Sequence, residues 1–431
     1  MFRKGSERIS VLFFYQHFWP DSPPYAAMLR SIGSRLNGHG IKVGILTAQP
    51  SYKPINFELK CASRETLDFI EVKRLSTLPG AKRIRAIALL GKVLFPIRGV
   101  FVVVGRKLLG DRPDVIVAAT IPPVLNGACG LLAARIAGAK FVYHMQDIYP
   151  EIGVAGGIWS RASIRYKFLY SIDAYIARRA DACVVLSKDM QNSLIERGVR
   201  KTSTHIINNF MLESFDKDKS SGNNNIDSLP QIASASDERE QPVKQVVDRS
   251  YRIVFAGNIG RFQALEQLLD AFMDEQCQHL PLELHFLGDG AVKAELQTQA
   301  GNSSAVHFHG HVPFEKAAKF IQECDAGIVS ISPDVIKYAY PSKTLSYLGL
   351  GVPLFAVVEQ QSELASDIEN ENLGVVCKGL SKEALVESYQ KLAVWLDDNK
   401  NSSDRIEQHA KRSGSPSAAT EKWKQLIDKI V

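Results

Sequence analysis

The chain has 431 residues, of which 45% are hydrophobic and 23% charged, and its formal net charge is +6. These proportions are typical of a globular protein and exclude a disordered or fibrous chain, and the length predicts two domains. The mild positive charge suits anionic ligands or an anionic membrane surface, but it does not indicate nucleic-acid binding.

The cysteines and the apolar runs indicate in which cellular compartment the protein is expected. Six cysteines are scattered singly, with no CxxC pair, which predicts free thiols in a reducing compartment: Cys61, Cys129, Cys183, Cys277, Cys324 and Cys377. The N-terminal MFRKGSERIS lacks the apolar core of a signal peptide, and no uncharged run reaches the roughly 18 residues of a membrane span. We therefore expect a cytoplasmic protein.

The first half alternates strand-length apolar runs with helical patterns. We expect a helix at 26–36 and strands at 9–15, 43–47, 115–119, 141–144 and 182–186. This alternation predicts an α/β, doubly wound domain over residues 1–212.

The stretch from Pro79 to Arg112 departs from this pattern. It mixes apolar residues with many basic ones and has no acid before Asp111. A basic amphipathic helix of this kind can lie on an anionic membrane. A pair of core helices interrupted at Pro96, with solvated basic edges, would explain the stretch equally well.

Residues 213–250 are rich in Ser, Asn, Asp, Glu, Lys and Gln and predict a disordered linker or insert. A second α/β series, the predicted domain 251–414, follows. Its expected strands are 251–256, 282–287, 306–309, 326–330, 354–358 and 374–376, and its expected helices are 314–323, 342–349 and 382–396. A last amphipathic helix is expected at 418–431. Two such halves place a site between them, at the carboxyl ends of the strands.

A glycine turn follows the first strand of the second half, with Gly257, Asn258 and Gly260 before Arg261. Such a turn directs backbone N–H groups and a helix N-terminus at an anion, and Arg261 adds a positive charge. An ordinary βα turn whose glycines only allow close packing would give the same pattern.

Two more groups belong to the same edge of the predicted sheet: Gly288, Asp289 and Gly290, and then Pro341, Ser342, Lys343 and Thr344. Together with Arg261 they offer the backbone donors, hydroxyls and cations that suit a diphosphate. Ser342 is also expected to cap the helix that it precedes. Lys343 in a first turn opposes the helix dipole, which favours a ligand-binding role.

The loop after the first strand contains several prolines and can form one wall of the site or a rigid surface loop: Pro20, Asp21, Pro23, Pro24 and Tyr25.

Histidines occur in two patterns. His144 ends a predicted strand and Asp147 follows on the next loop, so a structural and a functional role are both open. His307, His309 and His311 alternate, and we take them as structural because no matching cysteines or acids accompany them, with a metal site as the alternative.

These residues lie in motifs that resemble the family 4 glycosyltransferases of GT-B fold, and most closely the subgroup with the bacterial O-antigen and capsule L-fucosamine transferases. The motifs are FFYQHFWPDSPPY, LTAQPSY, ATIPPVLNG, FVYHMQDIYPE, FAGNIGRFQALEQLLDAF, FLGDG and YPSKTLSYLGLGVP. They are spread over most of the chain outside the polar stretch.

The resemblance implies two Rossmann-like domains, an N-terminal one for the acceptor and a C-terminal one for a UDP- or GDP-linked sugar, with helix 415–431 crossing back. It implies a retaining transferase that needs no metal. Arg261 and Lys343 would stabilise the leaving diphosphate, and His144 and Asp147 would lie near the transferred sugar. The acceptor would be a glycan or a polyprenyl-linked glycan of a surface polysaccharide (O-antigen, capsule or exopolysaccharide), at the cytoplasmic face of the inner membrane.

Three departures from the family leave alternatives open, and one of them is the long polar insert 213–250. Tyr338 and Ser346 occupy the positions of the family's two glutamates, and Ser346 would hold the nucleotide ribose only weakly. The usual lysine after Arg261 is also missing. A nucleotide-sugar epimerase on the same fold, or a catalytically degenerate binding partner in polysaccharide assembly, therefore remain alternatives.

Overall fold

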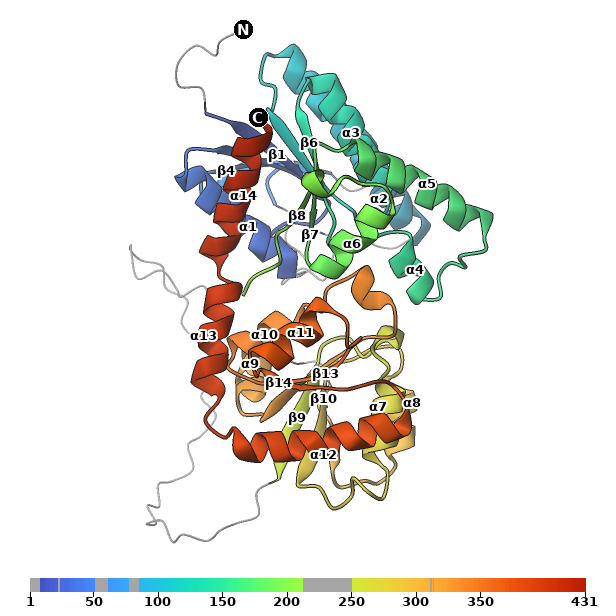
Figure 1. Ribbon diagram of the computed structural model, residues 1–431. Coiled ribbons are helices and arrows are strands. Elements are labelled where there is room, and N and C mark those ends of the chain that lie inside the picture. Colours follow the sequence, from blue (N-terminus) through green and yellow to red (C-terminus); the bar gives the residue numbers. More distant parts are fainter. Residues whose placement is uncertain are drawn as a thin grey trace, which may run out of the picture.

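The computed structural model describes residues 8–21, 24–50, 61–76, 85–211, 250–310, 312 and 314–431. These residues form two α/β domains, one above the other in Figure 1, each built on a mainly parallel sheet. The predicted fold class is confirmed. The polar stretch 213–249, Pro23 and residues 79–84 lie outside the described residues.

The N-terminal sheet has the strand order β3-β4-β2-β1-β5-β6-β7-β8, and every pair is parallel except β3–β4. The strands are β1 (Ser10–Phe14), β2 (Lys42–Ala48), β3 (Arg64–Leu67), β4 (Ile70–Leu75), β5 (Val115–Ala119), β6 (Lys140–His144), β7 (Ala182–Val185) and β8 (Thr204–Ile206). The central strands read as continuous apolar runs because helices cover both faces of the sheet.

Its helices are α1 (Pro24–Gly38), α2 (Arg85–Leu108), α3 (Leu125–Ala137), α4 (Glu151–Ala155), α5 (Ile164–Arg179), α6 (Lys188–Glu196) and the 3-10 helix η1 (Lys201–Ser203). Successive side chains of β1 enter different cores. Leu12 and Phe14 face α2 and α3, whereas Val11 and Phe13 face α1.

The helix α2 runs without a break through Pro96, so the expected interruption was wrong. Proline inside a helix removes one hydrogen bond and costs about 3 kcal/mol. Packing on both sides of Pro96 offsets this cost, since Phe95 and Val103 are buried and the ring of Phe95 lies 5.4 Å from that of Phe14.

The C-terminal sheet is parallel, with the order β11-β10-β9-β12-β13-β14. Its strands are β9 (Tyr251–Ala256), β10 (Leu282–Leu287), β11 (Val306–Phe308), β12 (Ala326–Ser330), β13 (Leu354–Val357) and β14 (Gly374–Val376). Its helices are η2 (Arg261–Gln263), α7 (Leu265–Phe272), α8 (Lys293–Ala300), α9 (Phe314–Gln322), η3 (Val335–Lys337), α10 (Lys343–Gly349), α11 (Glu363–Asn370) and α12 (Lys382–Asp398).

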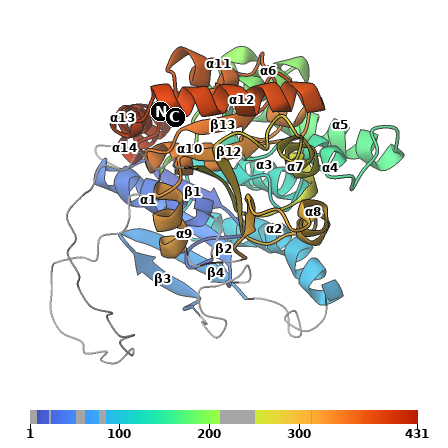
Figure 2. The same cartoon turned by 90° about the horizontal axis from the view of Figure 1, so that it is seen from below.

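Two cores flank this sheet. Residues of α7, α8 and α12 fill one core, and residues of α9, α10 and α11 fill the other. Figure 2, which looks at this domain from below, shows α9 on one flank and α7 and α8 on the opposite one.

The last two helices, α13 (Ser403–Ser413) and α14 (Pro416–Ile430), lead from the lower domain to the upper one (Figure 1). α14 packs against α1, and Trp423, Leu426 and Ile427 are buried in the N-terminal core. The ring of Trp423 meets that of Phe13 edge-on at 6.0 Å. The end of the chain is thus part of the N-terminal domain. Among the helices of the described residues, we find none with the length and apolar character to cross a membrane.

Candidate active site

The two glycine turns of the C-terminal domain touch one another. The N–H of Gly257 donates to the carbonyl of Leu287 at 2.8 Å. Gly257 and Gly288 have φ of +125° and +139°, which strongly favour glycine. A Cβ at Gly288 would lie 2.0 Å from the carbonyl oxygen of Gly257, and one at Gly290 would lie 2.1 Å from that of Ile259. The glycines therefore allow the turns to pack, and they leave little side-chain bulk where the strands end.

Lys343 reaches this pair of turns from the start of α10. A Cβ at Gly257 would come within 2.9 Å of its Cε, and its Nζ lies 4.1 Å from the centroid of the Phe255 ring. Burial lowers the pKa of Lys343 to about 8. A bound anion would restore the full charge of this ammonium group. The structure therefore brings Lys343 to the first glycine turn, as the sequence predicted.

The other predicted donor-binding residues lie around these three groups. Asn258, Arg261, Ser342 and Ser346 are exposed, and Arg261 begins η2 directly after the first turn. Ser342 does not cap α10 through its side chain, so that expectation was wrong. Its φ of −58° and ψ of −22° are already helical, whereas a capping serine has an extended backbone.

Two further members of the predicted donor set occupy the rim of this region. Pro341 is half-buried just before α10. Asp289 is exposed and forms an ion pair with Lys293 at 2.6 Å. Asp289 is thus part of the second turn, and Pro341 precedes the helix that carries Lys343.

Tyr338 lies where the two domains meet. Its hydroxyl accepts a hydrogen bond from Arg161 at 3.3 Å, and its carbonyl accepts one from the N–H of Ile148 at 2.7 Å. Asp147 also forms a β-bridge with Ala339. The carboxyl end of β6 therefore meets the segment that follows β12, and Tyr338 lies at the domain junction.

His144 is buried at the end of β6 and fully engaged. Its Nδ1 is shared by the hydroxyls of Tyr15 and Tyr25, the latter at 3.1 Å, and its Nε2 accepts from Gln146 at 2.9 Å. The ring also meets that of Trp423 edge-on at 5.2 Å. Burial lowers the pKa of His144 to about 3. The imidazole is thus a neutral hydrogen-bonding group at pH 7 and a poor base.

Asp147 lies half-buried three residues further on. Burial raises the pKa of its carboxyl to about 6. A carboxyl whose pKa is raised by burial, at the junction of two domains, is typical of a functional site.

The proline-containing loop converges on His144. Pro24 begins α1, and Tyr25 in its first turn reaches the imidazole. Half-buried Pro20 precedes Asp21, whose buried carboxylate pairs with Nδ1 of His17 at 3.0 Å. The structure thus brings this loop and His144 together, as parts of one wall.

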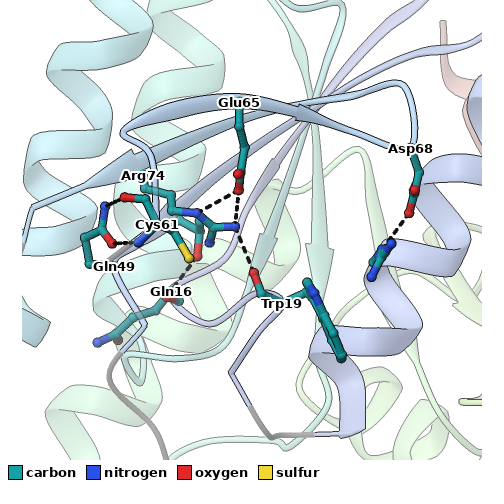
Figure 3. Close-up of polar contacts among 9 residues, drawn as sticks. Gln16, Trp19, Gln49, Cys61, Glu65, Asp68 and Arg74 are labelled. Carbon is teal, nitrogen blue, oxygen red and sulfur yellow. Dashed lines mark hydrogen bonds and ion pairs between the residues drawn. The ribbon is translucent and has the colours of Figure 1, made fainter. Parts of the chain in front are cut away.

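Sequence reasoning missed Arg74, which holds that loop in place (Figure 3). This buried arginine at the end of β4 donates to Glu65 through Nε at 3.1 Å and to the carbonyl of Trp19 at 2.9 Å. Its guanidinium also lies 5.7 Å from the ring centroid of Phe18. The sequence feature that could have indicated this role is an arginine at the end of the otherwise amphipathic strand IEVKRL.

A second buried network was also missed. Arg197 donates to Asp173 at 2.6 Å and to Glu151, and the hydroxyl of Tyr143 donates to Asp173 at 2.7 Å. Burial raises the pKa of Asp173 to about 6, although Arg197 partly counteracts it. The network lies beside a cavity of about 380 Å³ at the domain junction, which Arg161 and Tyr338 also line. The members of the network are far apart in sequence, so no local motif indicates it.

Comparison with known proteins agrees with this geometry. Residues 25–209 match the family described as a glycosyl transferase 4-like domain, and residues 250–393 match glycosyl transferases group 1. The probable glycosyltransferase WbjE of Pseudomonas aeruginosa is 24% identical over 62% of this chain and 62% of its own length. The putative colanic acid biosynthesis glycosyl transferase WcaI of Escherichia coli K12 is 23% identical over 64% of this chain and 65% of its own. Both alignments span less than two thirds of these relatives.

A solved structure extends the fold comparison to almost the whole chain. HepE of Anabaena, determined in complex with UDP, superposes with a TM-score of 0.63 at 14% identity, covering 98% of this chain and 100% of that one. The same protein has also been solved with UDP-glucose. The chain belongs to the family 4 glycosyltransferases and has the GT-B fold.

Proposed function

We propose that the protein is a retaining glycosyltransferase that uses a nucleotide-diphosphate sugar as donor. The observation that carries this proposal is the convergence of the Gly257 turn, the Gly288 turn and Lys343. A diphosphate placed there receives backbone donors and the ammonium group of Lys343, while exposed Arg261 supplies a second cation. The UDP and UDP-glucose bound by HepE favour a UDP-linked donor, with a GDP-linked sugar as the alternative.

The chain's own cations account for leaving-group stabilisation in this proposal. As the sugar–phosphate bond breaks, negative charge develops on the diphosphate, and Lys343 and Arg261 stabilise it more strongly than in the ground state. Transfer then needs no metal. Asp147 lies at the junction where the acceptor hydroxyl would approach, and the leaving phosphate itself accepts the proton of that hydroxyl in front-face attack.

The acceptor is proposed to bind the N-terminal domain, along the wall formed by the proline-containing loop. Arg74 and buried Gln16 support a polar ligand here, since Nη1 of Arg74 and Oε1 of Gln16 have no hydrogen-bond partner among the described residues. The relative named for colanic acid synthesis favours a glycan or lipid-linked glycan of a surface polysaccharide. No feature of the sequence suggests nucleic acid as a partner.

Contact with the cytoplasmic face of the membrane is proposed through α2. Leu90, Val93, Ile97, Phe101 and Leu108 are exposed on this helix at spacings of three, four, four and seven, which form one stripe. The neighbouring helices α3 and α5 add exposed apolar side chains, at Leu132, Phe168 and Tyr175. An apolar stripe accompanied by arginines and lysines suits an interface of anionic lipids.

Sedimentation with vesicles tests the membrane contact. The full-length protein should bind vesicles that contain anionic phosphatidylglycerol and not vesicles of phosphatidylcholine alone. The F101S/I97S variant should bind them at least several-fold more weakly, whereas exchange of the exposed Val394 on α12 for serine should change nothing. Equal binding by all three proteins would refute the role of α2.

The enzymatic proposal is tested by transfer and by product analysis. With a UDP-sugar and a polyprenyl-linked glycan acceptor, the wild-type protein should form the elongated glycan with retained anomeric configuration. Lys343→Ala and Arg261→Ala should abolish transfer. Conversion of the donor to its epimer without an acceptor would indicate an epimerase, and nucleotide binding without any turnover would indicate a degenerate binding partner.

A further inference from the structure

A cluster of imidazoles lies at one edge of the C-terminal sheet, on β10 and β11, ahead of the turn that begins at Gly288. His285 on β10 pairs in register with His307 on β11, and their rings stack at 4.6 Å between centroids. Glu283 precedes His285 by two residues, and His309 follows His307 by two. Because side chains two apart on a strand share a face, all four project to the same side of the sheet.

The ligand atoms of three of these residues are spaced like a metal coordination shell. Oε2 of Glu283 lies 3.5 Å from Nε2 of His285 and 4.0 Å from Nε2 of His307. All three atoms lie within 4.8 Å of one another. In tetrahedral zinc sites with bonds of about 2.0–2.1 Å, ligand atoms are about 3.3 Å apart. Closing this set on an ion would draw Oε2 of Glu283 about 0.2 Å closer to His285 and about 0.7 Å closer to His307.

His285 is the anchor of the cluster. It is 6% exposed, and its Nε2 is buried without a hydrogen-bond partner among the described residues. Its other nitrogen, Nδ1, lies 2.9 Å from Nε2 of His309. When Nδ1 carries the proton and donates it to His309, the lone pair of Nε2 faces Glu283 and His307. That is the arrangement in which a metal-binding histidine is oriented by a second hydrogen bond.

The charges around the cluster favour a cation. Arg252 pairs in register with Glu283, but its guanidinium also has a carboxylate of its own, that of Glu323 at 4.0 Å. An ion here would be held by one carboxylate and two imidazoles.

We propose that Glu283, His285 and His307 bind a divalent transition-metal ion, best fitted by Zn²⁺, with His309 as the orienting residue and a water as the fourth ligand. The ion would cross-link the edge strand β11 to β10 and so stabilise the donor domain. This site is separate from the glycine turns and independent of the proposed transfer reaction, which needs no metal. It favours the metal-binding alternative over the structural interpretation of these histidines.

Metal titration of the full-length protein tests the site. After treatment with EDTA and removal of the chelator, Zn²⁺ added during calorimetry should bind with a stoichiometry of one and raise the Tm. Co²⁺ should give the visible bands of a tetrahedral nitrogen and oxygen site, without the intense thiolate absorption that binding by the cysteines would cause. Absence of Zn²⁺ binding, or a thiolate spectrum, would overturn the proposal.

Three variants assign the ligands. His285→Gln/His307→Gln should weaken Zn²⁺ binding at least 100-fold, and Glu283→Gln, which leaves the buried imidazole in place, at least tenfold. His279→Gln changes an exposed histidine outside the cluster and should bind Zn²⁺ as the wild type does. Circular dichroism of the metal-free proteins checks the fold. Unchanged binding by folded Glu283→Gln would exclude the site even if the double variant misfolded.

Discussion

Donor affinity should depend on pH through Lys343. In the free protein, burial holds its pKa at about 8, well below the value of about 10.4 for an exposed lysine. A diphosphate beside the ammonium group reverses this shift, because an opposite charge favours the protonated form. Above pH 8, binding must therefore take up a proton, and the observed Kd must rise with pH.

The magnitude follows from the two pKa values. If the pKa of Lys343 in the complex exceeds 10, the observed Kd equals its low-pH value times (1 + 10^(pH − 8)). The Kd therefore rises about 30-fold between pH 7 and pH 9.5. The effect on folding has the opposite sign. The charged lysine destabilises the folded protein below pH 8, and this contribution disappears as pH rises from about 8 to above 10.

Isothermal titration of UDP between pH 7 and pH 9.5 measures this dependence. Lys343→Arg remains charged throughout and controls for ionisation of the nucleotide itself. Lys343→Ala should bind at least about tenfold more weakly at pH 7, since it loses a charge-assisted hydrogen bond. A wild-type Kd that changes with pH no more than that of Lys343→Arg would refute the placement of the diphosphate at Lys343.

Three further predictions concern stability and access to the turns. Arg197→Met should lower the unfolding free energy by about 3–5 kcal/mol in urea, because it leaves the buried carboxylates of Glu151 and Asp173 uncompensated, and a loss below 1 kcal/mol would contradict this. Gly288→Ala should abolish UDP binding or destabilise the domain, whereas Gly379→Ala, where a Cβ would only make an ordinary contact with the Cβ of Ala384 at 4.0 Å, should do neither. Because the pKa of Asp173 is raised in the folded protein, its ionised form lowers the free energy of unfolding at pH 7. Acidification to pH 5 protonates Asp173 and should offset part of the acid destabilisation, an offset that Asp173→Asn should lack.

The sequence predicted the elements that carry a strong local pattern. The buried strands of both sheets, the glycine turns and the group at Lys343 are all local signals, and parallel-sheet topology alone places them on one edge. The edge strands β3 and β8, the strand β4 next to β3 and the polar helix α13 escaped notice, because short or weakly apolar elements are defined by what they pack against.

What the sequence could not show depends on contacts between distant residues. The enclosure of His144 involves Tyr15, Tyr25 and Trp423, which come from three separate segments, and its low pKa follows from that packing. The role of Tyr338 at the domain junction likewise depends on Arg161, far away in the chain. The effect of these contacts on pKa and access is a property of the fold.

The most direct test of the account is a thermal-shift panel of nucleotides and nucleotide sugars on the wild-type protein and on Lys343→Ala. The account predicts that a UDP- or GDP-sugar and its nucleoside diphosphate raise the Tm of the wild type, that the matching nucleoside does not, and that the variant loses the shift. If no nucleotide raises the Tm of the wild type, or if Lys343→Ala responds as the wild type does, the glycine turns and Lys343 do not form the donor site.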